Sequence, residues 1–255
     1  MKSTMLARSW RPIVAIIVFI AFWELATRVF SIEEWLLPSP STILREAKDV
    51  VPTFMPHFTS TVELSISGFL IGTTVGLGVA TILHLLPRVR ETFFPFIILS
   101  QNMPIIVLAP LLVIWFGFNA LPKLIIITLA CFFPIAVSAL GGFTQTDREL
   151  VHYMKMMGAT KSQLFWKLEL PHAVPAIFSG LKIAGTYSVM AAVVSEWLGA
   201  QQGIGVFMTL AASSYRTPRV FVAIIVAMVL SLAFFGLILL FEKFLVRWQR
   251  KGSHS

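Results

Sequence analysis

Five polar side chains lie in long apolar runs of this sequence, and their hydrogen-bonding groups could bind a solute. They are Gln101, Asn102, Tyr187, Ser195 and Glu196. Polar side chains at membrane depth are costly, so they usually face a cavity or another helix. We therefore predict that these residues line a translocation pathway. Two alternatives stay open: amide bonds between packed helices for Gln101 and Asn102, and an interfacial position reaching water for Glu196.

A long basic segment, residues 144–174, separates two apolar runs. Connections between helices usually take about 2–8 residues, so we expect a segment of this length to be structured or functional. Thr146 and Glu149 have the spacing of a capping box, which predicts that a helix begins there. Gly158 can end that helix, because glycine adopts the left-handed conformation without steric cost.

A second helix is predicted directly after Gly158. Thr160 and Gln163 also have capping-box spacing, and Pro171 is expected to end the helix because it biases Leu170 away from the helical conformation. The segment is thus predicted to be a helix, a glycine turn and a helix at the membrane surface. Its residues alone leave three roles open: an amphipathic surface segment, packing against the spans, or docking in a groove of a partner protein.

The motifs of several enzyme classes are absent from the sequence. It contains no Gly-x-x-x-x-Gly-Lys-Ser/Thr run for binding ATP, no His-Glu-x-x-His zinc motif and no Gly-x-Ser-x-Gly nucleophile motif. Cys131 is the only cysteine, which excludes an intramolecular disulfide and a cysteine-rich metal site. We therefore expect no catalytic residue, no bound metal and no cofactor, so that the chain is not an enzyme by itself.

The elements that must position these residues are predicted to be membrane-spanning helices. The sequence is 57% hydrophobic and only 13% charged, whereas soluble domains are about a quarter charged. A helix needs about 20 apolar residues to cross the bilayer. Six stretches qualify, at residues 13–30, 62–86, 93–116, 121–143, 175–198 and 220–246. We therefore predict one all-α domain over residues 1–255, with six transmembrane helices in a lipid bilayer.

The basic residues predict the orientation, because lysine and arginine are enriched in cytoplasmic loops. The net charge of +8 comes largely from residues beside apolar runs, so we expect no nucleic-acid partner. With both termini inside, the cytoplasmic side receives Lys2, Arg8, Arg11, Arg88, Arg90, Arg148, Lys155, Lys161, Lys167, Lys182, Lys243, Arg247, Arg250 and Lys251. The sequence therefore predicts a multi-pass protein of the cell membrane with both termini in the cytoplasm.

Local patterns refine the first two spans. The first apolar run could be a cleaved signal peptide, but we favour an uncleaved anchor because Glu24 and Arg28 can pair at i,i+4 and carry the helix onward. Ser39 can cap a short surface helix that begins at Pro40. Glycines then recur every four residues on the second span, at Gly68, Gly72 and Gly76, a spacing that predicts close packing against another helix.

Gly158, followed nine residues on by Leu168-Glu169-Leu170-Pro171, resembles the cytoplasmic signature of permease subunits in ATP-binding-cassette importers. That signature runs Glu-Ala-Ala, three residues, glycine, nine residues, Ile-x-Leu-Pro. Other stretches are similar to the nitrate, taurine and aliphatic-sulfonate branch of the family, among them Leu37-Pro38-Ser39-Pro40, Trp115-Phe116-Gly117 and Glu196-Trp197. Within that branch, the run from Ser179 to Ser188 looks most similar to permeases for thiamine-pyrimidine precursors.

The resemblance implies a type I importer permease with a cytoplasmic coupling helix pair. Its solute would be small and polar or anionic, such as a sulfonate, nitrate or a thiamine-pyrimidine precursor. Its partners would be ATP-binding-cassette ATPase subunits that bind the ATP, an extracytoplasmic solute-binding protein and a second permease copy. The residues implied to couple to the ATPase are Asp147, Glu149, His152, Gly158, Ala159, Leu170 and Pro171. His152 stands where the family has glutamate, so it either makes a different contact or leaves docking to shape.

Two other classes of membrane protein are alternatives. An ion-coupled secondary transporter would typically show internal repeats and broken helices with carboxylates at the bilayer midplane. No repeat is visible here, and the acidic residues cluster near the ends of the spans. A membrane scaffold would need neither an ATPase nor a polar pathway.

Overall fold

The computed structural model describes residues 3–102 and 104–246, and every regular element within these ranges is a helix. In chain order these are α1 (Ser3–Val29), α2 (Pro40–Leu85), α3 (Pro87–Gln101), α4 (Ile105–Phe116), α5 (Ala120–Thr144), α6 (Arg148–Met156), α7 (Lys161–Leu164), a π-helical turn (Phe165–Glu169), α8 (Leu170–Glu196), α9 (Ile204–Ser213) and α10 (Thr217–Leu245). The predicted all-α fold class is confirmed. Four of the predicted cytoplasmic basic residues lie outside the described residues: Lys2, Arg247, Arg250 and Lys251.

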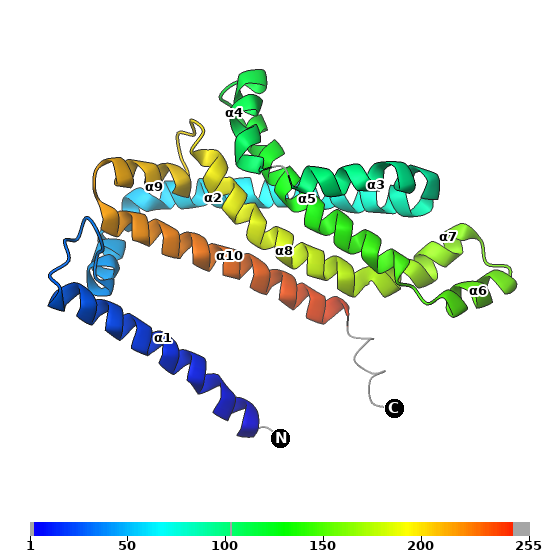
Figure 1. Ribbon diagram of the computed structural model, residues 1–255, viewed down its shortest axis with the longest axis horizontal. Coiled ribbons are helices and arrows are strands. Elements are labelled where there is room, and N and C mark those ends of the chain that lie inside the picture. The colour runs from blue at the N-terminus through cyan, green and yellow to red at the C-terminus, as the bar shows by residue number, and fades with distance from the viewer. Residues whose placement is uncertain (1–2, 103, 247–255) are drawn as a thin grey trace.

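Four long helices form the body of the molecule. Figure 1 shows α2, α5, α8 and α10 running alongside one another, with α6 and α7 projecting at one end and α9 lying at the other. We call the end from which α6 and α7 project the α6 end, and the end where α9 lies the α9 end. Helix α1 runs along one side of this body, and most of its apolar side chains are exposed, as expected for a helix that meets lipid.

Five helical runs are long and apolar enough to cross a membrane. They are Trp10–Val29, Pro40–Leu85, Ala120–Thr144, Lys161–Glu196 and Thr217–Leu245. These runs correspond to the predicted spans 13–30, 62–86, 121–143, 175–198 and 220–246. The predicted count of six is not confirmed, because the remaining stretch is not one helix.

The stretch predicted as a single span at residues 93–116 is divided between α3 and α4. Pro104 precedes α4 in an extended conformation, with φ −63° and ψ 110°, and it lacks the N–H that a continuous helix would need there. With 12 residues, α4 is about 18 Å long, which is too short to cross the bilayer alone. In Figure 1 it projects away from the four long helices.

The predicted surface helix at Pro40 is not separate from the second span. Ser39 caps it as expected, since its side chain accepts a hydrogen bond from Thr42 N and Pro40 occupies the first turn. The helix then continues through Pro52 and Pro56 to Leu85 as α2. Figure 1 shows the light-blue start of α2 turned away from the line of its cyan remainder, which fits the helix-bending effect of internal prolines.

Glycines allow α2, α5 and α8 to pack closely, which confirms the packing interpretation of the glycine spacing on α2. A Cβ atom added at Gly72 on α2 would lie 2.6 Å from Cys131 Cβ on α5. A Cβ atom added at Gly180 on α8 would lie 2.7 Å from Pro134 O, which also belongs to α5. Both distances are too short for real atoms, so a side chain at either position would separate the helices. Helix α5 is thus held between α2 and α8.

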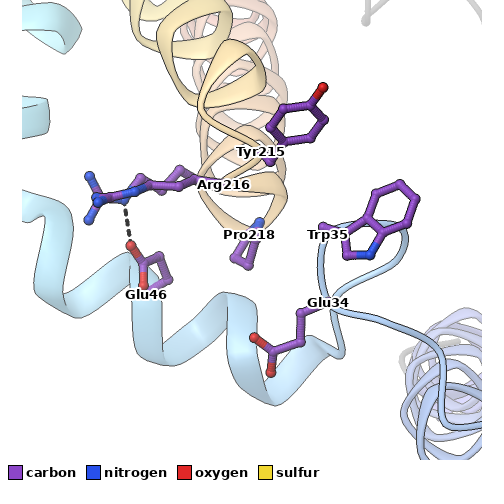
Figure 2. A pocket seen from close by; sticks show the side chains of 7 residues that line it. Glu34, Trp35, Glu46, Tyr215, Arg216 and Pro218 are labelled. Carbon is purple, nitrogen blue, oxygen red and sulfur yellow. Dashed lines mark hydrogen bonds and ion pairs between the residues drawn. The ribbon is translucent and has the colours of Figure 1, made fainter.

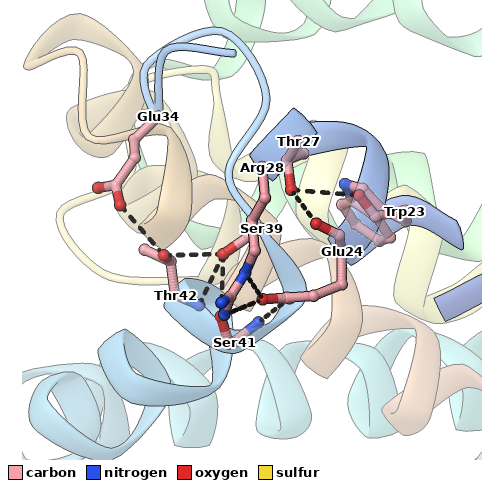
Figure 3. Close-up of polar contacts among 8 residues, drawn as sticks. All are labelled: Trp23, Glu24, Thr27, Arg28, Glu34, Ser39, Ser41 and Thr42. Carbon is pink, nitrogen blue, oxygen red and sulfur yellow. Dashed lines mark hydrogen bonds and ion pairs between the residues drawn. The ribbon is translucent and has the colours of Figure 1, made fainter. Parts of the chain in front are cut away.

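Polar contacts tie the chain together at the α9 end. The Arg219 guanidinium pairs with Glu46, with Nε 2.5 Å from Oε1, and joins the start of α10 to α2. The predicted pair of Glu24 and Arg28 is also present (Figure 3). Glu24 accepts two further hydrogen bonds from Ser41, from the backbone N–H at 3.0 Å and from the hydroxyl at 2.8 Å, which fastens α1 to the start of α2.

Candidate functional site

Helix α6 begins at Asp147, whose side chain accepts a hydrogen bond from Glu149 N at 2.8 Å. The predicted capping box between Thr146 and Glu149 is therefore wrong. Thr146 is buried, and its hydroxyl donates instead to Phe143 O, 3.1 Å away in the last turn of α5. Asp147 takes over as the cap because a carboxylate one residue later reaches the same free N–H groups and also suits the positive end of the helix dipole.

The turn after α6 has the geometry predicted for Gly158. Gly158 has φ +80°, its N–H donates to Lys155 O at 3.0 Å, and the N–H of Ala159 donates to Met154 O at 3.0 Å. These two bonds form a Schellman motif, which satisfies the last carbonyls of the helix. The second capping box is confirmed: Gln163 N donates to Thr160 Oγ1 at 3.2 Å, and Thr160 N donates to Gln163 Oε1 at 2.9 Å.

Pro171 does not end the second helix, contrary to the prediction. Leu170 is helical, with φ −64° and ψ −49°, and its N–H donates to Phe165 O five residues back. A π-helical turn has a wider spacing of hydrogen bonds, which accommodates a proline that has no N–H to offer. The helical run therefore extends without interruption from Lys161 to Glu196.

A polar pair joins this π-helical turn to the end of α2. His84 Nε2 lies 2.7 Å from Glu169 Oε2, and the two side chains are 14% and 13% exposed. The His84 ring also lies against Phe143 and Phe165, with ring centroids 5.0 and 6.1 Å away. We call His84, Phe143, Phe165 and Glu169 the α6 junction, because they join α2, α5 and α8 at the α6 end.

Helix α6 offers a free surface beyond this junction. None of its residues is buried, and its apolar side chains include Tyr153, which is 58% exposed, and Met156, which is 75% exposed. An exposed apolar patch flanked by charged residues is typical of a protein interaction site. The predicted coupling residues fall into two groups. Those on α6 and at its two ends are exposed: Asp147, Glu149, His152 and Gly158. Those in the following turn and at the start of α8 are partly buried: Ala159, Leu170 and Pro171.

A buried network closes the opposite end of α8. Glu196 is 2% exposed, and its carboxylate accepts hydrogen bonds from Thr61 Oγ1 at 2.7 Å and from Gly205 N at 2.8 Å. Thr61 Oγ1 in turn accepts from Ile204 N at 2.8 Å, and Gly203 N donates to His57 Nδ1 at 3.1 Å. We call His57, Thr61, Glu196 and residues 203–205 the α9 junction, because they fix the turn between α8 and α9 onto α2.

Glycine is required twice in the α9 junction. Gly203 has φ +139°, a conformation that side chains rarely adopt, and a Cβ atom there would overlap the Glu196 carboxylate. A Cβ atom at Gly205 would overlap Val193 O. The backbone of α9 therefore approaches α8 more closely than any other residue type permits, and this is what brings the Gly205 N–H within reach of Glu196.

The other predicted pathway residues are not gathered around Glu196. Ser195 is fully buried and donates to Ala192 O of its own helix, whereas Tyr187 is 44% exposed midway along α8. Gln101 and Asn102 are exposed at the end of α3, where the Asn102 amide donates to Ile98 O. Among the hydrogen bonds described for the chain, none links these two amides to the residues on α8. The pathway role of all five residues stays a prediction.

Glu196 does border a polar hollow of about 290 Å³. Its other lining residues come from α2, α5 and the turn before α9, and include Ser60, Glu63, Ser67, Lys123 and Gln202. This hollow and both junctions contain residues that sequence reasoning missed: His57, Thr61, Glu63, Lys123 and the partnership of His84 with Glu169. Histidines near the ends of an apolar run were a visible feature, but their partners lie far away in the sequence.

Comparison with known proteins supplies the family context. Residues 72–247 match the family described as binding-protein-dependent transport system inner membrane component. The formylaminopyrimidine transport permease of Halalkalibacterium halodurans is 32% identical over 241 residues, which cover 94% of this chain and 96% of that protein.

Two further relatives and one solved structure agree with this match. The taurine transport permease of Escherichia coli is 28% identical, and the match covers 81% of this chain and 77% of that protein. The putative aliphatic sulfonates transport permease of Bacillus subtilis is 26% identical, and the match covers 91% of this chain and 85% of that protein. The crystal structure of an amino acid ABC transporter with histidines has a TM-score of 0.61 at 20% identity, over 80% of this chain and 98% of that chain. At this identity the structural likeness shows the fold alone.

Proposed function

The chain belongs to the family of binding-protein-dependent transport system inner membrane components, which makes it a permease subunit of an ATP-driven importer, and we propose that residues 144–174 couple it to the ATPase. It is a multi-pass membrane protein and not an enzyme itself. The family match favours this role over an ion-coupled secondary transporter. The observation that carries the proposal is the exposed helix α6 and its glycine turn, which lead directly into a helical run ending at Glu196.

We propose that helix α6 docks in a groove of a separate ATPase subunit. Its exposed tyrosine and methionine side chains supply apolar contact area, and the charged residues beside them would set the register. Gly158 and the Schellman motif keep the turn short and stiff. His152 is exposed in the middle of α6 and would take the position of the family's glutamate in this contact. The ATP itself would be bound by the partner, since the sequence has no phosphate-binding loop.

The same segment is built to transmit movement. Because the run from Lys161 to Glu196 is one continuous helix, a displacement of its first turns by the ATPase would tilt α8 as a rigid body. His84 and Glu169 would carry part of that movement to α2. Since α5 is packed tightly between these two helices, we propose that α2, α5 and α8 move together when the pathway changes the side to which it opens.

We propose a small polar or anionic solute for this importer. The supporting facts are the relatives for formylaminopyrimidine, taurine and aliphatic sulfonates, which all carry solutes of that kind. An extracytoplasmic solute-binding protein would deliver the solute, and two copies of the chain would form the pathway. In this arrangement the α6 end and both termini face the cytoplasm, in keeping with the distribution of basic residues.

One experiment tests the proposal against its alternatives. The chain is purified with its ATPase subunit, reconstituted in proteoliposomes with the solute-binding protein, and assayed for uptake driven by ATP or by an imposed ion gradient. We expect the ATPase subunit to co-elute and uptake to follow ATP alone. Uptake that follows an ion gradient without ATP would contradict the importer role. ATP-driven uptake that survives deletion of residues 149–157 would contradict the assignment of α6.

A further inference from the structure

A hollow of about 430 Å³ lies at the α9 end, between two segments that are far apart in the sequence (Figure 2). One wall comes from the connection between α1 and α2 and from α2 itself, and the other comes from the turn between α9 and α10 and from the start of α10. Its lining residues are Glu34, Trp35, Glu46, Tyr215, Arg216, Pro218 and Arg219.

Two polar ties hold the walls of this hollow in place. The hydroxyl of Thr217 donates to Trp35 O at 2.5 Å, and Arg219 pairs with Glu46. The first contact joins the start of α10 to the connection between α1 and α2, and the second joins it to α2. The hollow is therefore shaped before any ligand arrives, which lowers the ordering cost of binding.

Its rim carries two aromatic rings that the chain itself hardly uses. Tyr215 has φ +54°, a conformation that is uncommon for a bulky residue, yet its side chain is 77% exposed. Trp35 is 56% exposed. Figure 2 shows the Trp35 ring beside the connection between α1 and α2, and the Tyr215 ring at the turn that leads into α10. Tyr215 takes the left-handed position of a Schellman motif that ends α9, since its N–H donates to Ala212 O and the N–H of Arg216 donates to Ala211 O. This turn fixes the backbone that carries the exposed ring.

The charges of the hollow leave one cation uncommitted. Glu46 is paired with Arg219, and Glu34 accepts a hydrogen bond from Thr42 Oγ1 at 3.1 Å. Arg216 is exposed, and no acidic partner for it is found among the residues that the structure describes. A guanidinium forms its strongest contacts with a carboxylate, through two parallel hydrogen bonds.

We infer that this hollow docks the extracytoplasmic solute-binding protein, with an acidic side chain of that partner pairing with Arg216 between Trp35 and Tyr215. Tryptophan, tyrosine and arginine are the residue types that dominate the binding energy of protein interfaces. The inference rests on the proposed function, which places the α9 end outside the cell. An anionic lipid headgroup offers Arg216 a negative charge as well, so capture of lipid is one of the outcomes that the test below distinguishes.

The test uses the reconstituted importer in nanodiscs and the purified solute-binding protein of the same transporter. Binding is measured as the concentration of that protein that half-stimulates ATP hydrolysis, for the wild type, Arg216→Glu, Tyr215→Ala and Trp35→Ala. The Trp35 change keeps the backbone carbonyl that Thr217 holds. The control is Arg45→Glu, an exposed arginine on α2 outside the hollow that carries the same change of charge.

We expect Arg216→Glu to raise the half-stimulating concentration about tenfold or more, and the two aromatic variants to raise it about fivefold. The Arg45→Glu control should stay within about twofold of the wild type, because rim charges outside a contact change affinity little. Hydrolysis without the binding protein should be the same in all variants, which shows that the ATPase is still engaged.

Three results would overturn the inference. If the wild type is stimulated and Arg216→Glu and both aromatic variants keep wild-type affinity, the surface is wrong while the proposed function stands. If a photo-crosslinking residue at Tyr215 captures only lipid, the rings are anchors at the membrane interface. If the ATPase subunit does not co-elute with the wild type, the proposed function fails and the docking partner fails with it.

Discussion

The two ends of α8 are fastened to α2 in different ways. At the α9 end, Glu196 is almost fully buried and its carboxylate accepts two hydrogen bonds, from Thr61 and Gly205. At the α6 end, His84 and Glu169 form one contact and both remain partly exposed. The α9 junction is thus held by more buried hydrogen bonds than the α6 junction, and we expect it to be the firmer of the two attachments when segment 144–174 is moved.

The largest effect is expected from breaking the α9 junction. Glu196→Ala leaves the Gly205 N–H buried without an acceptor and leaves the Thr61 hydroxyl with only His57 O, which should lower the free energy of unfolding by about 3 kcal/mol. Glu196→Gln keeps one acceptor oxygen and should lose less. The measurement is unfolding in mixed detergent micelles. Glu63→Ala is the control, because Glu63 borders the same hollow but is exposed; an equal loss in the control would remove Glu196 from the junction.

A smaller effect is expected from loosening the packing that both junctions share. Gly72→Ala places a methyl group against Cys131 on α5 and should destabilise the protein by about 2 kcal/mol. Gly78→Ala is a matched control on the same helix, because no atom lies within 4 Å of its added Cβ. It should be neutral or stabilising by up to about 1 kcal/mol, since alanine favours a helix more than glycine does. Equal thermal shifts for both variants would contradict the close packing of α2 on α5.

The smallest loss of stability is expected at the α6 junction. Glu169→Ala should cost about 1 kcal/mol, and His84→Ala somewhat more, because it also removes a ring that packs against Phe143 and Phe165. The double variant should cost little more than His84→Ala, because the polar contact is already lost in either single variant. A double-mutant cycle by detergent unfolding measures this coupling. A loss as large as that of Glu196→Ala would contradict the difference between the two ends.

Much of the fold could be predicted from local sequence. Apolar length located five of the spans, and glycine spacing on α2 indicated where it packs. Capping chemistry placed the Gly158 turn and the Thr160 cap, because such bonds link residues only three to five positions apart. The resemblance over segment 144–174 led to the family that the comparisons confirmed.

The errors arose where a local rule was overridden. Pro171 should disfavour a helical Leu170, but the π-helical turn relieves the conflict and the helix continues. Asp147 displaced Thr146 as the cap because Thr146 is buried and bonded to Phe143. The two junctions could not be predicted, since Thr61 meets Glu196 and His84 meets Glu169 only after α2 and α8 pack together.

The central claim is that the stiff turn at Gly158 transmits the movement of the ATPase subunit to α8. No atom of this chain lies within 4 Å of an added Cβ at this position, so within the chain a substitution there acts through the backbone conformation. Valine strains a positive φ, by about 1–3 kcal/mol, whereas asparagine tolerates it. The direct measurement is the amount of solute taken up per ATP hydrolysed in proteoliposomes. We predict that Gly158→Val lowers this ratio about tenfold and that Gly158→Asn keeps it near the wild-type value; a wild-type ratio for Gly158→Val would contradict the account.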